Sequence, residues 1–195
     1  LRFPAGRSGL PAGGSRKCHV HHPERDRQRS VAIAGAGGKA LGRPPDRHLL
    51  CRNRIRRNGT AGPGREISNG QFGENLTTQG IDLNSCLIGE RWQIGEVILE
   101  ISEPRIPCKV FAGFWDRPTL IKEFTDARRS GAYLRIIQEG EFEAGAMINV
   151  ISRPDHQITI KDIFSAKAGE RDKVAQIQKV SQLSEKYRNW ALALN

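Results

Sequence analysis

Short apolar runs separated by polar and glycine-containing turns occupy the stretch between residues 87 and 152, and this pattern predicts a sheet. The runs fall at residues 87–88, 91–94, 97–101, 132–138 and 147–152. Turns containing Gly89 and Gly95 separate the first three runs. Strands of this length between closely spaced turns indicate an antiparallel sheet or a small barrel.

Apolar residues recur every three or four positions in four further segments, which predicts helices. The first begins around Asp116-Arg117-Pro118, with Asp116 or a neighbour as its N-cap, and ends at Gly131. The other three follow Pro154. They cover residues 160–167 after a Thr159 cap, residues 170–180, and the residues after a Ser184 cap. We therefore predict an α+β fold with a strand-rich core at 67–153 and a three-helix appendage at 154–195.

Residues 1–66 differ from the rest of the chain in charge. They hold 15 Lys and Arg against 4 Asp and Glu, whereas residues 67–195 hold 16 against 17. The net charge of +10 would ordinarily suggest a nucleic-acid partner, because clustered cations neutralise phosphates. Since the whole excess lies in the first third, we do not expect the folded part to bind nucleic acid.

Three interpretations of residues 1–66 compete. The segment is a basic arm that binds nucleic acid, a disordered tail, or a stretch read out of its native frame. We favour the third, because GC-rich DNA read out of frame yields the Arg, Gly, Pro and Ala that dominate here. The chain also begins without Met, and its single Met is Met147, so we expect a fragment or a misplaced start.

The four cysteines show no spacing typical of a metal site or of a disulfide framework. No signal-peptide pattern is present, and no apolar run approaches the roughly 20 residues that span a bilayer. We expect a cytoplasmic protein without a membrane partner.

Cys108 is the candidate reactive group. Pro104 and Pro107 stiffen the segment before it, and the positive charges of Arg105 and Lys109 favour the thiolate form, which attacks substrates or binds metals. The alternative is that Cys108 is a small hydrophobic residue of the core. The loop at 72–78 is likewise open to two interpretations, a backbone that approaches a pocket or a loop closed by local Thr hydrogen bonds.

Four motifs carry a resemblance to a known family. They are Phe72-Gly73-Glu74-Asn75-Leu76-Thr77, Ile88-Gly89-Glu90-Arg91, Pro104-Arg105-Ile106-Pro107-Cys108 and Gly131-Ala132-Tyr133-Leu134. From about Asn69 to its end, the chain resembles the MOSC family, named after the C-terminal domain of molybdenum cofactor sulfurase, in its bacterial YiiM-like form. The resemblance implies a β-barrel of mostly antiparallel strands with a C-terminal three-helix satellite.

The resemblance also implies a site for molybdenum cofactor (molybdopterin), with Cys108 as catalytic residue and molybdenum ligand. A soft thiolate suits this metal, and a ligand must be deprotonated. Asn75 would lie near the metal or the pterin, and Arg105 near the pterin or its phosphate. Glu74 and Thr77 complete the expected cofactor-binding set.

Relatives in the family reduce N-hydroxylated bases, such as hydroxylaminopurines, with electrons from a separate redox protein. The resemblance therefore implies a molybdenum-dependent oxidoreductase with an electron-donor partner and a small N-hydroxylated substrate. The alternatives are a non-catalytic carrier of the cofactor and an inactive truncated remnant. The remnant is considered because residues 1–66 hold no recognisable counterpart of the upstream half that completes the family's barrel.

Overall fold

The computed structural model describes residues 17–20, 30–32, 48–53, 72, 74–143 and 145–194. Three strands come from the first third of the chain: β1 (Lys17–Val20), β2 (Ser30–Ala32) and β3 (His48–Asn53). Beyond these strands, the predictions for residues 1–66 lie outside the described residues.

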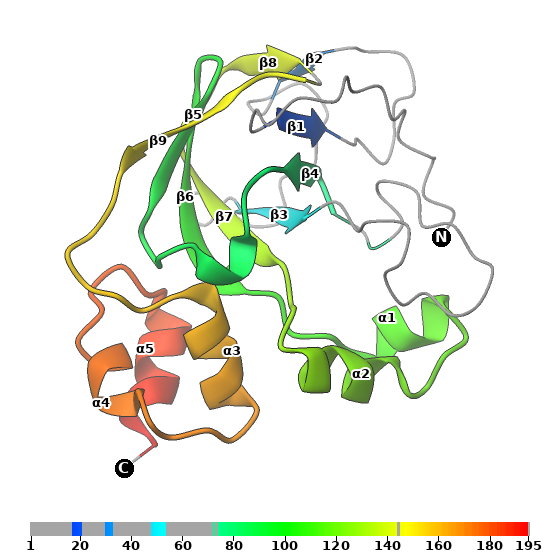
Figure 1. Cartoon of the computed structure of the whole chain (residues 1–195), viewed down its shortest axis with the longest axis vertical. Coiled ribbons are helices and arrows are strands. Elements are labelled where there is room, and N and C mark those ends of the chain that lie inside the picture. Colours follow the sequence, from blue (N-terminus) through cyan, green and yellow to red (C-terminus); the bar gives the residue numbers. More distant parts are fainter. Residues whose placement is uncertain are drawn as a thin grey trace.

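A seven-stranded sheet in the order β1-β4-β3-β7-β6-β5-β9 forms the centre of the fold (Figure 1). Its remaining strands are β4 (Leu76–Gln79), β5 (Arg91–Ile94), β6 (Val97–Pro104), β7 (Ala132–Gln138) and β9 (Ile148–Ser152). Strands β7, β6, β5 and β9 form an antiparallel part, whereas β3 and β4 are parallel. A second pair joins β2 to β8 (Glu141–Glu143).

The fold is thus mixed α+β, as predicted. Closure into a barrel is not shown, because β1 and β9 stand at the two ends of the sheet order and no pairing joins them within the described residues.

The β5–β6 hairpin follows directly from the alternation of its residues. Trp92 pairs with Leu99 and is fully buried, and the next inward pair is Ile94 with Val97. Gly95 adopts a positive φ of 56° in the turn, a conformation that favours glycine. The hairpin confirms the predicted strands and turn, although β6 continues past Ile101 to Pro104.

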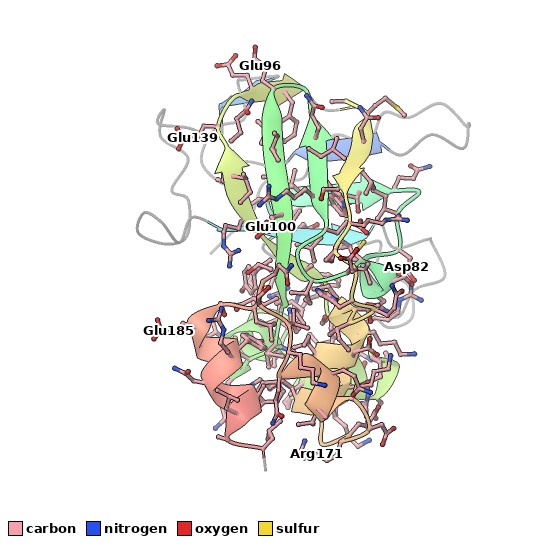
Figure 2. The ribbon with its side chains drawn as sticks, turned by 90° about the vertical axis from the view of Figure 1, so that its left-hand side faces the viewer. Asp82, Glu96, Glu100, Glu139, Arg171 and Glu185 are labelled. Atoms are coloured by element: carbon pink, nitrogen blue, oxygen red, sulfur yellow. The ribbon has the colours of Figure 1, made fainter. Side chains whose placement is uncertain are left out.

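The other face of β6 carries an ion-pair cluster around Glu100, whose position is labelled in Figure 2. Glu100 is only 5% exposed, and its carboxylate accepts from Arg91 of β5 at 2.8 Å and from Arg135 of β7 at 2.6 Å. Three neighbouring strands are therefore joined by one buried carboxylate whose charge is compensated on both sides.

Two groups of helices lie at the same end of the sheet, opposite the turns marked by Glu96 and Glu139 (Figures 1 and 2). One group is α1 (Lys109–Phe114) with α2 (Leu120–Ala127), and the other is α3 (Ile160–Lys167), α4 (Val174–Ile177) and α5 (Glu185–Leu192). A single-turn 3₁₀-helix, η1 (Leu83–Ser85), precedes β5.

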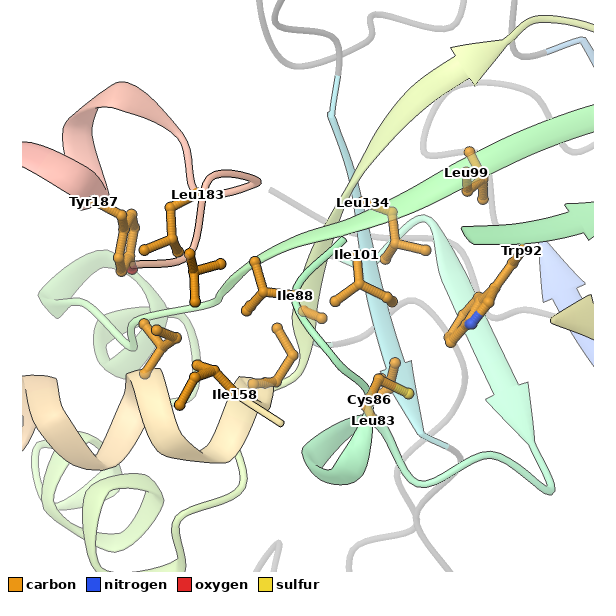
Figure 3. Close-up of a cluster of buried hydrophobic side chains, with 14 of the residues drawn as sticks. Leu83, Cys86, Ile88, Trp92, Leu99, Ile101, Leu134, Ile158, Leu183 and Tyr187 are labelled. Atoms are coloured by element: carbon orange, nitrogen blue, oxygen red, sulfur yellow. The ribbon is translucent and has the colours of Figure 1, made fainter. Parts of the chain in front are cut away.

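The C-terminal helices share one hydrophobic core with the sheet. Figure 3 shows this core running from Leu99 and Trp92 through Ile88 and Ile158 to Tyr187. The predicted caps are present: the Thr159 hydroxyl accepts from the Asp162 N–H in a capping box, and the Ser184 hydroxyl accepts from the N–H of Tyr187. The three helices are therefore docked on the sheet by burial.

The helix predicted at 170–180 is shorter than expected, with only Val174–Ile177 in α-helical conformation. The buried residues Val174, Ile177 and Val180 recur every three positions, not every 3.6. That period suits consecutive tight turns, which place all three side chains on one side without a continuous α-helix.

The prediction of a helix from Asp116 to Gly131 is wrong about where the helix begins and where it ends. Asp116 adopts a positive φ of 49° in the link between α1 and α2, Thr119 is the N-cap, and Arg128, at a φ of 51°, ends the helix. The preceding helix α1 was not predicted. No helix among the described residues is long and apolar enough to cross a membrane.

Candidate functional site

Cys108 lies between the end of β6 and the first turn of α1, with its side chain exposed. It is the N-cap residue of α1 and has extended backbone angles, with φ −129° and ψ 169°. Its carbonyl oxygen accepts from the N–H of Ala112 at 3.0 Å, so the residue is held in the helix start while its thiol stays accessible. Cys86, by contrast, is buried in the main core, as expected for a structural cysteine.

Arg105 is held against the ring of an aromatic residue of α1. Its guanidinium carbon lies 4.2 Å from the ring centroid of Phe111, a cation–π geometry. Its backbone N–H donates to the carbonyl of Gly131 at 3.2 Å. Both ends of the Arg105 residue are therefore fixed, which keeps a positive charge in the segment that leads into Cys108.

Glu74 lies in the loop of the first motif, whereas Thr77 lies in β4, the strand into which that motif continues. The Glu74 carboxylate is 2% exposed and accepts from the N–H of Phe72 at 3.0 Å and from the hydroxyl of Thr77 at 3.1 Å. Thr77 is itself fully buried. These contacts fix the shape of the loop around Asn75. The Asn75 side chain is half-buried, and its orientation depends on this loop.

A cluster of aromatic rings joins this loop to α1 and α2. Phe72 makes edge-on contacts with Phe111, Trp115 and Phe124 at centroid distances of 5.4, 5.2 and 5.8 Å. We call these four rings the aromatic cluster. Because Phe72 stands beside Glu74 and Phe111 lies three residues after Cys108, the aromatic cluster brings together the two motifs that the sequence singled out.

Tyr133 is a neighbour of Cys108 that sequence reasoning did not assign to the site. It is paired with Glu103 across β6 and β7. Burial raises the pKa of the Tyr133 phenol, the positive charge of Arg105 opposes the rise, and the charges of Glu103 and Cys108 add to it. The sequence analysis identified the motif that contains Tyr133. The pairing of β6 with β7, which brings Tyr133 near Cys108, cannot be inferred from the sequence alone.

The side chains near Cys108 suit a metal whose other ligands come from a bound organic molecule. Within the described residues, no group of three or more His, Cys, Asp or Glu side chains could hold a metal ion by itself. Cys108 offers one accessible soft donor, and Arg105 offers a cation for an anionic group beside it. These residues fit a metal-bearing organic cofactor better than a bare ion.

Comparisons with known proteins identify the family and the fold. The family model described as the MOSC domain matches residues 47–149, just over half of the chain. The match includes β3, so it begins inside residues 1–66, where the sequence resemblance identified no counterpart of the family, and not at about Asn69. It also includes Asn75, Arg105, Cys108 and Tyr133.

Three curated relatives match parts of the chain. The uncharacterized protein YflK of Bacillus subtilis (strain 168) is 27% identical over 127 residues, 64% of this chain and 58% of that protein. A protein named Reductase from Gibberella moniliformis is 33% identical over 86 residues, 44% of this chain and 15% of that protein. Protein YiiM of Escherichia coli (strain K12) is 28% identical over 82 residues, 42% and 37% of the two chains. The matches thus span less than two thirds of each relative's length.

Two crystal structures resemble the whole arrangement. YiiM from Geobacillus stearothermophilus superimposes with a TM-score of 0.69 at 27% identity, covering 84% of this chain and 83% of that one. YiiM from Escherichia coli gives a TM-score of 0.72 at 16% identity, covering 92% and 91%. The second likeness shows the shared fold alone.

Proposed function

Because this chain belongs to the MOSC domain family, we propose that it binds molybdenum cofactor through Cys108 and reduces small N-hydroxylated compounds with electrons from a partner protein. The observation that carries the proposal is the accessible Cys108 thiol at the end of a proline-stiffened segment. A curated relative named Reductase supports the oxidoreductase class.

The protein's own residues account for cofactor binding as follows. Cys108 supplies the thiolate, and Arg105, fixed on Phe111, supplies a cation for a phosphate or a polar pterin edge. Asn75 offers an amide from the neighbouring loop. Glu74, which accepts from the hydroxyl of Thr77 and from the N–H of Phe72, acts by shaping that loop.

When bound, the cofactor supplies electron-pair transfer to the nitrogen–oxygen bond of the substrate. Cleavage of an N-hydroxyl group takes up that electron pair and two protons, and it releases the amine and water. Burial raises the pKa of Tyr133, so its phenol keeps its proton at neutral pH and is suited to donate a hydrogen bond, not to release the proton. The remaining side chains of the site bind and orient the cofactor and the substrate. The partner protein supplies new electrons after each reaction.

A second candidate function is a non-catalytic carrier of the cofactor. The exposure of Cys108 favours it, because a carrier must release its cargo to another protein. A third candidate, an inactive remnant, is kept because closure of the sheet is not shown among the described strands.

The test is a turnover assay on protein made in cells that synthesise molybdenum cofactor. Wild type, Cys108→Ala and Cys86→Ala receive a chemical electron donor and a hydroxylaminopurine, and the amine product is measured. The reductase proposal predicts turnover in wild type and in Cys86→Ala and its loss in Cys108→Ala. Bound cofactor without turnover in wild type would indicate a carrier, and protein that takes up no cofactor would indicate a remnant.

A further inference from the structure

The last helix of the chain holds the strand end that leads into Cys108. The Ser184 hydroxyl donates to the Glu103 carboxylate at 2.9 Å, and the Tyr187 hydroxyl donates to the Pro104 carbonyl at 3.3 Å. Glu103 and Pro104 are the last two residues of β6, whereas Ser184 and Tyr187 come 81 and 83 residues later. Two successive residues of the strand are thus bound by one turn of α5.

Tyr187 is itself fixed in position. It is 2% exposed, and Figure 3 shows it in the same core as Leu183 and Ile88. The Lys167 ammonium lies 5.0 Å from the Tyr187 ring centroid and 3.7 Å from that of Trp190. Burial, reinforced by Glu103, raises the pKa of Tyr187, so its hydroxyl remains a donor at neutral pH.

Little freedom remains between Pro104 and Cys108. Pro104 and Pro107 have fixed φ angles, and the backbone N–H of Arg105 is bonded to Gly131. The residue before each proline is restricted as well. We therefore expect a displacement of the Pro104 carbonyl to reach Cys108.

We propose that Ser184 and Tyr187 are positioning residues for Cys108, so that the C-terminal helices take part in forming the site. Their effect on the geometry of the Cys108 segment follows from the hydrogen bonds alone. The consequence for bound molybdenum rests on the proposed function. Because Ser184 is also the N-cap of α5, Tyr187→Phe is the cleaner test, since it removes one hydroxyl and leaves the buried ring.

The experiment compares full-length wild type, Tyr187→Phe and Thr159→Ala. Thr159→Ala removes the cap of α3 and weakens the same helical region, but it leaves in place the side chains that bond to Glu103 and Pro104. The first readouts are hydrogen exchange of the Arg105 amide, whose N–H is bonded to Gly131, and the alkylation rate of Cys108, with buried Cys86 as internal reference. We expect Tyr187→Phe to speed exchange of this amide about two- to tenfold and to change the Cys108 rate, because one net hydrogen bond no longer holds the strand end. We expect Thr159→Ala to leave both at wild-type values.

A second readout uses cofactor-loaded protein. Tyr187→Phe should retain molybdenum but alter its thiolate-to-metal absorption, whereas Thr159→Ala should keep the wild-type spectrum. Equal behaviour of the two variants in exchange and alkylation would overturn the inference, as would a wild-type spectrum in loaded Tyr187→Phe. If wild type takes up no molybdenum, the proposed function fails, and the exchange and alkylation rates still decide the positioning role.

Discussion

The rings of Phe72 and Phe111 meet edge-on, with centroids 5.4 Å apart and ring planes at 81°. This contact joins the loop that carries Asn75 to the helix that begins after Cys108. It is the structural basis for treating the two motifs as one site, and its energetic weight can be measured.

Phe72→Ala should lower the free energy of unfolding by about 3–5 kcal/mol, the range for truncating a buried Phe. Phe72 is 5% exposed and contacts three other rings. Phe114→Ala is the matched control, because Phe114 is 43% exposed, and it should cost about 1 kcal/mol or less. Urea unfolding measures both, and equal losses would show that the aromatic cluster contributes no special stability.

Asp162 predicts how stability changes in acid. Burial alone would raise the pKa of this carboxyl, but hydrogen bonds from Lys173 and Thr159 outweigh burial and lower it below 3.8. The stabilisation is therefore present above the unfolded pKa and is lost as pH falls through the folded one.

Between about pH 5 and the lower pKa, wild type should lose more stability than Asp162→Asn, because only wild type takes up this proton. Asp126→Asn is the control. It removes a carboxylate from an exposed ion pair with Lys122, which contributes little. Urea unfolding at several pH values measures the three slopes. An acid dependence of Asp162→Asn identical to wild type would contradict the assignment.

The chain holds two tyrosines, Tyr133 and Tyr187, and burial raises the pKa of both. At pH 10 the folded protein should show much less tyrosinate absorbance than the same protein in denaturant. The neutral phenols stabilise the fold fully below the unfolded pKa, and that contribution is lost as pH rises above it. Tyr187→Phe should lose less stability in this alkaline range than wild type. If both phenols titrate in the folded protein as they do in the denatured protein, the claim that burial raises their pKa is contradicted.

The antiparallel part of the sheet could be predicted from the sequence, whereas β1, β3 and β4 could not. Alternation and the Gly95 turn identified β5 and the start of β6, and the caps at Thr159 and Ser184 located two helices. These features depend on neighbours within a few residues, so their signals are local.

Helix α1 and the place of Tyr133 could not be predicted, because both depend on distant contacts. Helix α1 is six residues long and is held by Phe111 packing on Phe72. Tyr133 is placed opposite Glu103 by the pairing of β6 with β7, next to a register shift in β6. A shift of this kind leaves no pattern in the residues on either side.

The molybdenum-to-protein ratio of purified protein tests the central claim most directly. Wild type, Cys108→Ala and the buried-cysteine control Cys86→Ala are prepared in parallel from cells that make molybdenum cofactor, and metal and pterin are measured together. We predict that wild type and Cys86→Ala retain both, whereas Cys108→Ala loses most of its molybdenum. Equal molybdenum in wild type and Cys108→Ala would contradict the assignment of Cys108 as the ligand.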